Sequence, residues 1–335
     1  MLIKYINKYL ILIIINLSFL CTNLSVYGQD NYMDYHHEII QCEQLIAAGK
    51  FKVAIAGFDS LFSRYDFVFL RDCKVATQLS AFEKDTNSVF MFMRLGIMNG
   101  WTLKSIEKND KLSLFHDDPQ WKTLLSEYDS MHNRYLEGLN VSLRNQVNEM
   151  YKIDQKKAMG ALFRIGQKSK VKYAEKKFAP HSEKQLDQLN EILDQHGYPG
   201  EQFIGNNWWA SVILSHHNSI SVDYNSKDTL YFQIKPKLMN ALKNGEVSPI
   251  EFVIIEDWRT AVLNEHKLTS YGFLGAIPSD SVLAIVNKNR AGIGLRSIEL
   301  RNKLIDIEKE TEINLYLPKD WQKGKITVAN NMESN

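Results

Sequence analysis

The stretch that decides the fold is IIQCEQLIAAGKFKVAIAGFDSLF, residues 39–62. Its apolar residues recur at α-helical spacing on both sides of a Gly-Lys-Phe turn. Gly49 permits a tight turn between antiparallel helices, because glycine adopts backbone conformations that other residues avoid. Ala54 allows the second helix to approach the first closely, and Phe58 and Leu61 are placed to fill the space between them. The stretch therefore predicts a helical hairpin.

The spacing from Gly49 to Leu61 is similar to the turn and second helix of a tetratricopeptide repeat, a hairpin that stacks into solenoids. A degenerate second copy is expected between Cys73 and Trp101, where similar positions hold Asp85, Val89, Met93 and Gly96. LFHDDPQWKTLL, residues 114–125, resembles the half-repeat that closes such arrays. The alternative is a set of helical hairpins without repeat ancestry.

The first residues have the layout of a secretory signal. Lys4 and Lys8 precede a short apolar run, and Val26-Tyr27-Gly28 supplies a cleavage site. The run is short for a membrane span and is interrupted by polar residues. We expect cleavage after Gly28, export to the periplasm or the medium, and a mature chain that is not an integral membrane protein.

The composition of the mature chain excludes several classes of partner. Cleavage removes two of the 40 basic residues and leaves the 39 acidic ones, so the net charge becomes −1. A nearly neutral chain does not attract nucleic acid, and the sequence indicates no cofactor and no metal site. Cys42 and Cys73 remain after cleavage. They are expected as buried free thiols, with a Cys42–Cys73 disulfide as the alternative.

The remaining chain also reads as helices. Ser182 with Gln185 resembles a capping box that starts a helix, and Gly197 suits its C-terminal end. Ser248-Pro249-Ile250-Glu251 is the strongest helix start in the chain. In contrast, the segment INLYLPKDWQKGKITV, residues 313–328, alternates like a short pair of strands.

These patterns predict a mainly α fold, in which tetratricopeptide-like helical hairpins are followed by a helical domain with a small C-terminal β element. The expected parts are a signal peptide (1–28), a tetratricopeptide-like region (29–138), a helical domain (139–275), and C-terminal helices with short strands (276–335).

One pair of residues is a candidate for acid–base chemistry. His217 shares a helix face with apolar residues, and Asp257 lies on or beside the apolar face of a later helix. A buried carboxylate needs a partner, and a carboxylate beside a histidine raises the basicity of the imidazole. Two interpretations stay open: a polar cluster that holds helices in register, or a His217–Asp257 base in a cleft.

Five short motifs occur in order along residues 143–272: Asp154-Gln155, Tyr198-Pro199-Gly200, His217, Asp257 with Arg259, and Tyr271-Gly272. This order resembles an uncharacterised bacterial domain family, the domain of unknown function 6624. Its members carry Asp-Gln, Trp-Pro-Gly, Gln-His-Ala-Asp, Asp-Arg and Tyr-Gly-Thr-Gln. The chain departs from that pattern at Tyr198, His216, Asn218-Ser219, the residue between Asp257 and Arg259, and Phe273-Leu274.

The resemblance implies a fold unit and a polar cluster rather than a reaction. It places Asp154, Gln155, Arg259 and Tyr271 as binding residues around His217 and Asp257. The first functional hypothesis is an exported helical module that binds a protein, a peptide or an envelope component. The alternative is an envelope hydrolase or transferase that uses His217 and Asp257 as an acid–base pair.

Overall fold

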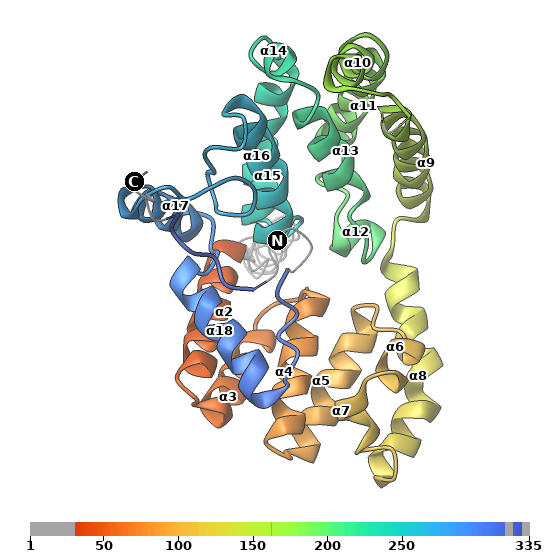
Figure 1. The fold of residues 1–335 in the computed structure, drawn as a ribbon. Coiled ribbons are helices and arrows are strands. Elements are labelled where there is room, and N and C mark those ends of the chain that lie inside the picture. The colour runs from red at the N-terminus through yellow and green to blue at the C-terminus, as the bar shows by residue number, and fades with distance from the viewer. Residues whose placement is uncertain (1–30, 162, 319–323, 330–335) are drawn as a thin grey trace, which may run out of the picture. The chain divides into compact units, whose positions relative to one another are not determined.

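The structure is a computed structural model that describes residues 31–161, 163–318 and 324–329. Residues Tyr32–Asn335 form one compact unit. Every regular element within the described ranges is a helix, which confirms a mainly α fold (Figure 1). The predicted signal peptide lies outside the described residues.

The predicted N-terminal hairpin is confirmed. Helices α2 (Tyr32–Ala47) and α3 (Phe51–Phe62) pack together around a turn in which Gly49 has a φ of 70°. Ala54, Phe58 and Leu61 are fully buried between the elements, as their spacing predicts. The first helical pair therefore follows from the sequence alone.

A second helical pair follows directly. Helices α4 (Leu70–Phe82) and α5 (Thr86–Met98) pack closely, and Asp85 accepts a hydrogen bond from the backbone of Ser88 to start α5. Trp101 and Trp121 anchor the adjoining core. The helices that complete this part are α6 (Leu103–Glu107), α7 (Asp110–Ser113) and α8 (Pro119–Gly138).

The middle of the chain forms a second group of helices around the largest core, where α13 packs against α16 (Figure 1). Ser248 accepts a hydrogen bond from the backbone of Glu251, which confirms the predicted start of α16. The elements are α9 (Val141–Ala158), a 3₁₀ turn (Met159–Ala161), α10 (Gln167–Tyr173), a π-helical turn (Ala174–Phe178), α11 (Ala179–His196), α12 (Glu201–Ile204), α13 (Trp209–Asn218), α14 (Val222–Asn225), α15 (Leu230–Lys243) and α16 (Pro249–Leu263).

The predicted start of α11 is wrong. The helix begins at Ala179 with Pro180 in its first turn, so Ser182 lies inside the helix and does not cap it. The hydroxyl of Ser182 instead contacts His217, and the side-chain amide of Gln185 donates to the carbonyl of Met150. Tertiary partners thus occupy both side chains that resembled a capping box.

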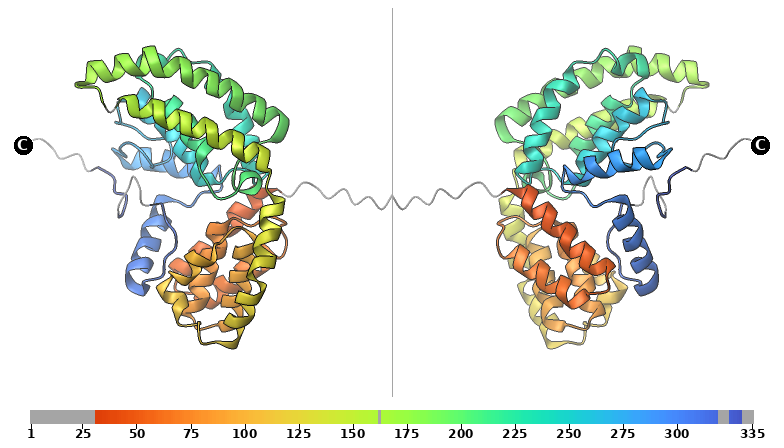
Figure 2. Two further views of the ribbon diagram at one scale, coloured as in Figure 1. Left: turned by 90° about the vertical axis from the view of Figure 1, so that its right-hand side faces the viewer. Right: turned by 90° about the vertical axis from the view of Figure 1, so that its left-hand side faces the viewer.

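The C-terminal part returns to the N-terminal helices. Helix α17 (Asp280–Ala291) is followed by α18 (Ile298–Thr311), and α18 packs against α2 (Figure 2). Leu300 and Leu304 share one hydrophobic core with the α2–α3 hairpin. Ile277, Val286, Ile298 and Ile326 form a small core of their own, so the residues after 276 are divided between that core and the core of the hairpins.

The expected C-terminal strands are absent from the described residues. The segments 312–318 and 324–329 form no ladder, and residues 319–323 lie outside the description. Ile313, Leu315 and Leu317 are nevertheless buried, and they belong to the core of the N-terminal hairpins. The alternation is real, but these side chains pack against helices and not against a partner strand.

Two further predictions concern covalent and membrane features. Cys42 and Cys73 are buried free thiols, so the alternative of a Cys42–Cys73 disulfide is wrong for this structure. Burial raises the pKa of the Cys42 thiol to about 12. Within the ranges that the structure describes, no helix combines the length and apolar character needed to cross a bilayer.

Candidate functional site

The predicted pair of His217 and Asp257 does not form. His217 on α13 is fully buried, with Nδ1 3.0 Å from the hydroxyl of Ser182 and Nε2 3.3 Å from a carboxylate oxygen of Asp228. Asp228 also accepts a hydrogen bond from Arg259 at 2.8 Å. The imidazole thus finds a different carboxylate, on the turn before α15.

The surroundings of Asp228 explain this choice. Burial opposes its ionisation, but contacts with His217 and Arg259 hold the pKa of Asp228 at about 2. Arg259 also donates to the backbone carbonyl of Asn225 at 2.7 Å. The cluster ties the turn that contains α14 to α13 and α16, and its Ser182, His217 and Asp228 side chains are sealed from solvent.

Asp257 has a separate structural role. Its carboxylate accepts hydrogen bonds from the Thr269 hydroxyl at 2.8 Å and from four backbone N–H groups. These N–H groups belong to Ser270, Tyr271, Phe273 and Leu274. Burial raises the pKa of Asp257, and these hydrogen bonds oppose that rise. The side chain fixes the loop after α16 and is not positioned as a base for His217.

The structure instead brings Asp154 to the neighbouring histidine. Asp154 on α9 is fully buried, and it hydrogen-bonds Nδ1 of His216, whose side chain is 30% exposed. Gln155 is half-buried beside it on α9, and the ring of Tyr271 packs edge-on against Phe252. Arg259 therefore meets His217 through Asp228, and the backbone of Tyr271 binds Asp257, whereas Asp154 binds His216. The predicted residues form separate local contacts and not one binding cluster around a His217–Asp257 pair.

A cavity lined by both apolar and polar side chains lies elsewhere in the compact unit. It has a volume of about 450 Å³, within the range of small-molecule pockets. Helices α2 and α4 contribute to its wall, together with α12 and the start of α16. The segments before and after α18 complete the lining. A second cavity, of about 430 Å³ beside α14, is lined mostly by charged groups. One of these groups, Glu183, already accepts a hydrogen bond from the hydroxyl of Tyr224 at 3.0 Å.

The two arginines of the larger pocket are already paired. Arg71 lies 2.8 Å from Glu43 and 2.9 Å from Asp72, while Arg296 makes a two-pronged contact with Glu43. Tyr35 donates to Asp72 at 2.8 Å. Although burial raises the pKa of Glu43, Arg296 and Arg71 bring it below its usual value. The network is neutral as a whole and connects α2, α4 and the segment before α18.

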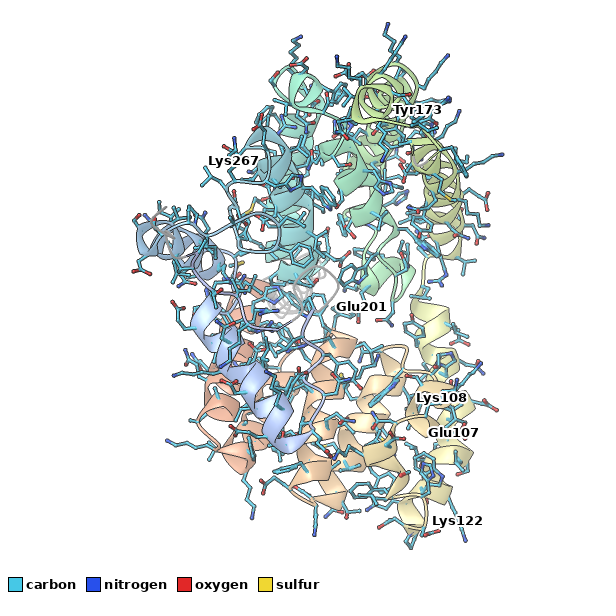
Figure 3. The ribbon with its side chains drawn as sticks, viewed as in Figure 1. Glu107, Lys108, Lys122, Tyr173, Glu201 and Lys267 are labelled. Carbon is cyan, nitrogen blue, oxygen red and sulfur yellow. The ribbon has the colours of Figure 1, made fainter. Side chains whose placement is uncertain are left out.

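Two carboxyl groups of the pocket have no such neutralisation. Glu201 accepts a hydrogen bond from the backbone N–H of Leu70 at 2.6 Å. Glu251 lines the same cavity and lies 3.4 Å from the hydroxyl of Tyr198, and its charge is one of the causes that raise the pKa of Glu201. Burial raises the pKa of Glu201 to about 8 and that of Glu251 to about 7. Figure 3 shows Glu201 on α12, where the group of helices α9 to α16 meets the N-terminal helices.

Aromatic and neutral groups complete the lining. Trp208 is 42% exposed, and Tyr316 holds a φ of 50°, a region that a bulky residue rarely adopts. His36 is almost fully buried, and its Nε2 has no hydrogen-bond partner in the part of the chain that the structure describes. Burial lowers the pKa of His36 to about 3, so the ring is neutral.

The chain was compared with protein-family models, with curated proteins and with solved structures, and none of them matches. Within the described residues, no cluster of three or more potential ligands is arranged to hold a metal ion. The pocket geometry is therefore the principal evidence on function.

Sequence reasoning missed this pocket, because its residues come from distant segments. Glu251 appeared only as a helix-start residue. Glu201 carried no pattern at all. The only available signal was the unusual pair Trp208-Trp209, of which Trp209 is packed against the core and Trp208 is left partly exposed.

Proposed function

We propose that this protein is an exported helical binding protein, and that the pocket holds a small molecule or the end of an envelope component or peptide. The observation that carries the proposal is the cavity of about 450 Å³ with both aromatic and unneutralised polar lining. Such a combination of apolar surface with a few convergent polar groups is characteristic of ligand sites. The N-terminal hairpins, whether or not they are tetratricopeptide repeats, supply one wall.

The arrangement favours binding over hydrolysis. The acid–base pair on which the hydrolase hypothesis depended is not formed, and His217 is sealed from any substrate. Among the described residues that line the pocket, no side chain is arranged as an activated nucleophile. The polar clusters at the motifs that resemble the domain of unknown function 6624 would hold a binding scaffold rigid through internal ion pairs.

A ligand panel tests the proposal. Purified protein is screened by thermal shift against neutral, anionic and cationic small molecules and short peptides, and the hits are measured by calorimetry. We expect Trp208→Ala to weaken the binding of any true pocket ligand by about tenfold, because aromatic side chains supply large contact areas. Phe163→Ala is the matched control, since Phe163 is 78% exposed and does not line the pocket. Binding that is unaffected by Trp208→Ala, or an absence of binding in every class, contradicts the proposal.

Export is tested separately. The full chain is expressed with its own N-terminus in a bacterial host, and the cell fractions are compared. We expect the protein in the periplasm or medium with Gln29 as its first residue. Retention in the cytoplasm with Met1 intact contradicts the export part of the proposal.

A further inference from the structure

The pocket is lined by charged groups of both signs, and some of them are already paired within the protein. Arg71 and Arg296 face Glu43 and Asp72, and Arg71 also donates to the carbonyl of Leu315 at 2.9 Å. These guanidinium groups are engaged within the protein. An anionic ligand would have to displace an internal carboxylate, which is costly for buried pairs.

The carboxyl groups of Glu201 and Glu251 are in the opposite situation. Neither forms an ion pair among the described residues, and the donors to their carboxyl groups are neutral: the Leu70 N–H for Glu201, and the Tyr198 and Ser248 hydroxyls for Glu251. The positive charge of Lys74 lowers the pKa of Glu201 slightly, but the two side chains form no ion pair. The ammonium group of Lys74 lies over the rings of Trp101 and Tyr316. Removing a carboxylate from water without a counter-charge is expensive. Among the described residues, no cation is in direct contact with either carboxyl group.

The neutral lining is consistent with the same ligand. The backbone of Leu242 contributes a hydrogen bond to the buried ring of His36, and Nε2 remains without a partner within the described ranges. Because the ring nitrogen that faces a carbonyl carries the proton, Nε2 is an acceptor. An acceptor nitrogen and two carboxyl groups all suit a donor with several N–H bonds. Trp208 adds an aromatic surface that attracts cations.

We infer that the pocket recognises an organic cation, a ligand whose primary ammonium group is held by Glu201 and Glu251. This inference rests on the proposed binding function and specifies its ligand class. The cavity has room for the organic part of such a molecule beside Trp208 and Tyr316. Cations of this chemistry include diamines and the amino ends of short peptides.

Binding of a cation to these carboxyl groups is coupled to protons. Both carboxyl groups bind protons near neutral pH, and an ammonium group favours their ionised forms. The other titratable groups around them are His36 and Glu43 on α2, Asp72 and Lys74 on α4, Tyr198, Arg71, Arg296 and Tyr316. These surrounding groups are paired or neutral, and their charge does not change near pH 7. Because Glu201 and Glu251 lose their protons in this range, we expect the affinity for the cation to rise between about pH 6 and pH 8.

The test uses two probes of the same length, 1,5-diaminopentane and 1,5-pentanediol, with the purified protein in calorimetry at pH 8. We expect the diamine to bind at least about tenfold more tightly than the diol. Glu201→Gln and Glu251→Gln are each expected to reduce diamine affinity by about tenfold or more, whereas Glu137→Gln, at an exposed site outside the pocket, leaves it unchanged. Thermal melting confirms that each variant is folded.

The outcomes separate the two proposals. Equal binding of diol and diamine, or diamine binding unaffected by both Gln variants, overturns the cation inference. A neutral or anionic ligand that binds with dependence on Trp208, while the diamine does not bind, overturns this inference and leaves the proposed function standing. An absence of any Trp208-dependent ligand overturns both.

Discussion

At the scale of single residues, buried polar groups are satisfied by the nearest loop rather than by the partner that a helical projection suggests. The positions of His217 and Asp257 on buried helix faces were predicted correctly, and both are fully buried. Their partners were not, because Asp228 and the 269–274 loop approach through irregular backbone that has no periodic pattern. A sequence indicates that a buried carboxylate needs partners, but not which ones.

Asp257 provides a test of this view. Asp257→Asn places an amide donor against N–H or O–H donors of the loop, so at least two of the five hydrogen bonds are lost. We expect the free energy of unfolding to fall by about 2–4 kcal/mol, measured by urea denaturation at pH 7. Asp306→Asn, at a side chain that is 41% exposed, is the control and should change it by less than about 0.5 kcal/mol. Equal effects of the two substitutions would show that the loop does not depend on Asp257.

At the scale of elements, helical hairpins were predictable and the extended C-terminal segment was not. Gly49 and Ala54 encode a local turn and a close contact, which depend on residues near in sequence. The alternation of Ile313, Leu315 and Leu317 correctly indicated one buried face. What covers that face is the N-terminal core, more than 200 residues earlier in the chain. Alternation alone does not distinguish a helical partner from a strand.

The first hairpin is tested by overpacking. Ala54→Trp inserts a large ring at a fully buried position, so we expect a loss of about 2–4 kcal/mol in unfolding free energy. The neighbouring Val53→Trp is the matched control, because Val53 is 56% exposed on the other side of the same helix. Thermal and urea unfolding of both variants measure the difference. Similar stability of the two would contradict the packing of α3 against α2.

At the scale of the whole compact unit, the C-terminal segment closes onto the N-terminal helices and thereby completes the pocket. Arg296, just before α18, pairs with Glu43 on α2, and Leu304 shares the hairpin core. The Cβ of any larger residue at Gly294 would lie 2.5 Å from the Cβ of His36, and Gly294 has a φ of 66°. The pocket therefore depends on contacts between the two ends of the unit, which no local motif reveals.

A double-mutant cycle measures this closure. Arg296→Leu alone leaves a buried carboxylate with less compensation, and we expect it to lower the unfolding free energy by about 3 kcal/mol. Glu43→Leu combined with Arg296→Leu should cost less than the sum of the two single changes, with a coupling of about 1–3 kcal/mol. Additive losses in urea denaturation would mean that this ion pair does not link the ends of the unit.

The most direct test of the account is the number of protons released when 1,5-diaminopentane binds. Calorimetry at pH 7 in phosphate and in Tris, whose ionisation heats differ, gives that number independently of the affinity. Because burial raises the pKa of Glu201 to about 8 and of Glu251 to about 7, the pocket carries protons that a bound ammonium group expels. We predict release of about one proton, reduced in Glu201→Gln. Binding with no release of protons, or with proton uptake, would contradict the claim that these carboxyl groups hold the cation.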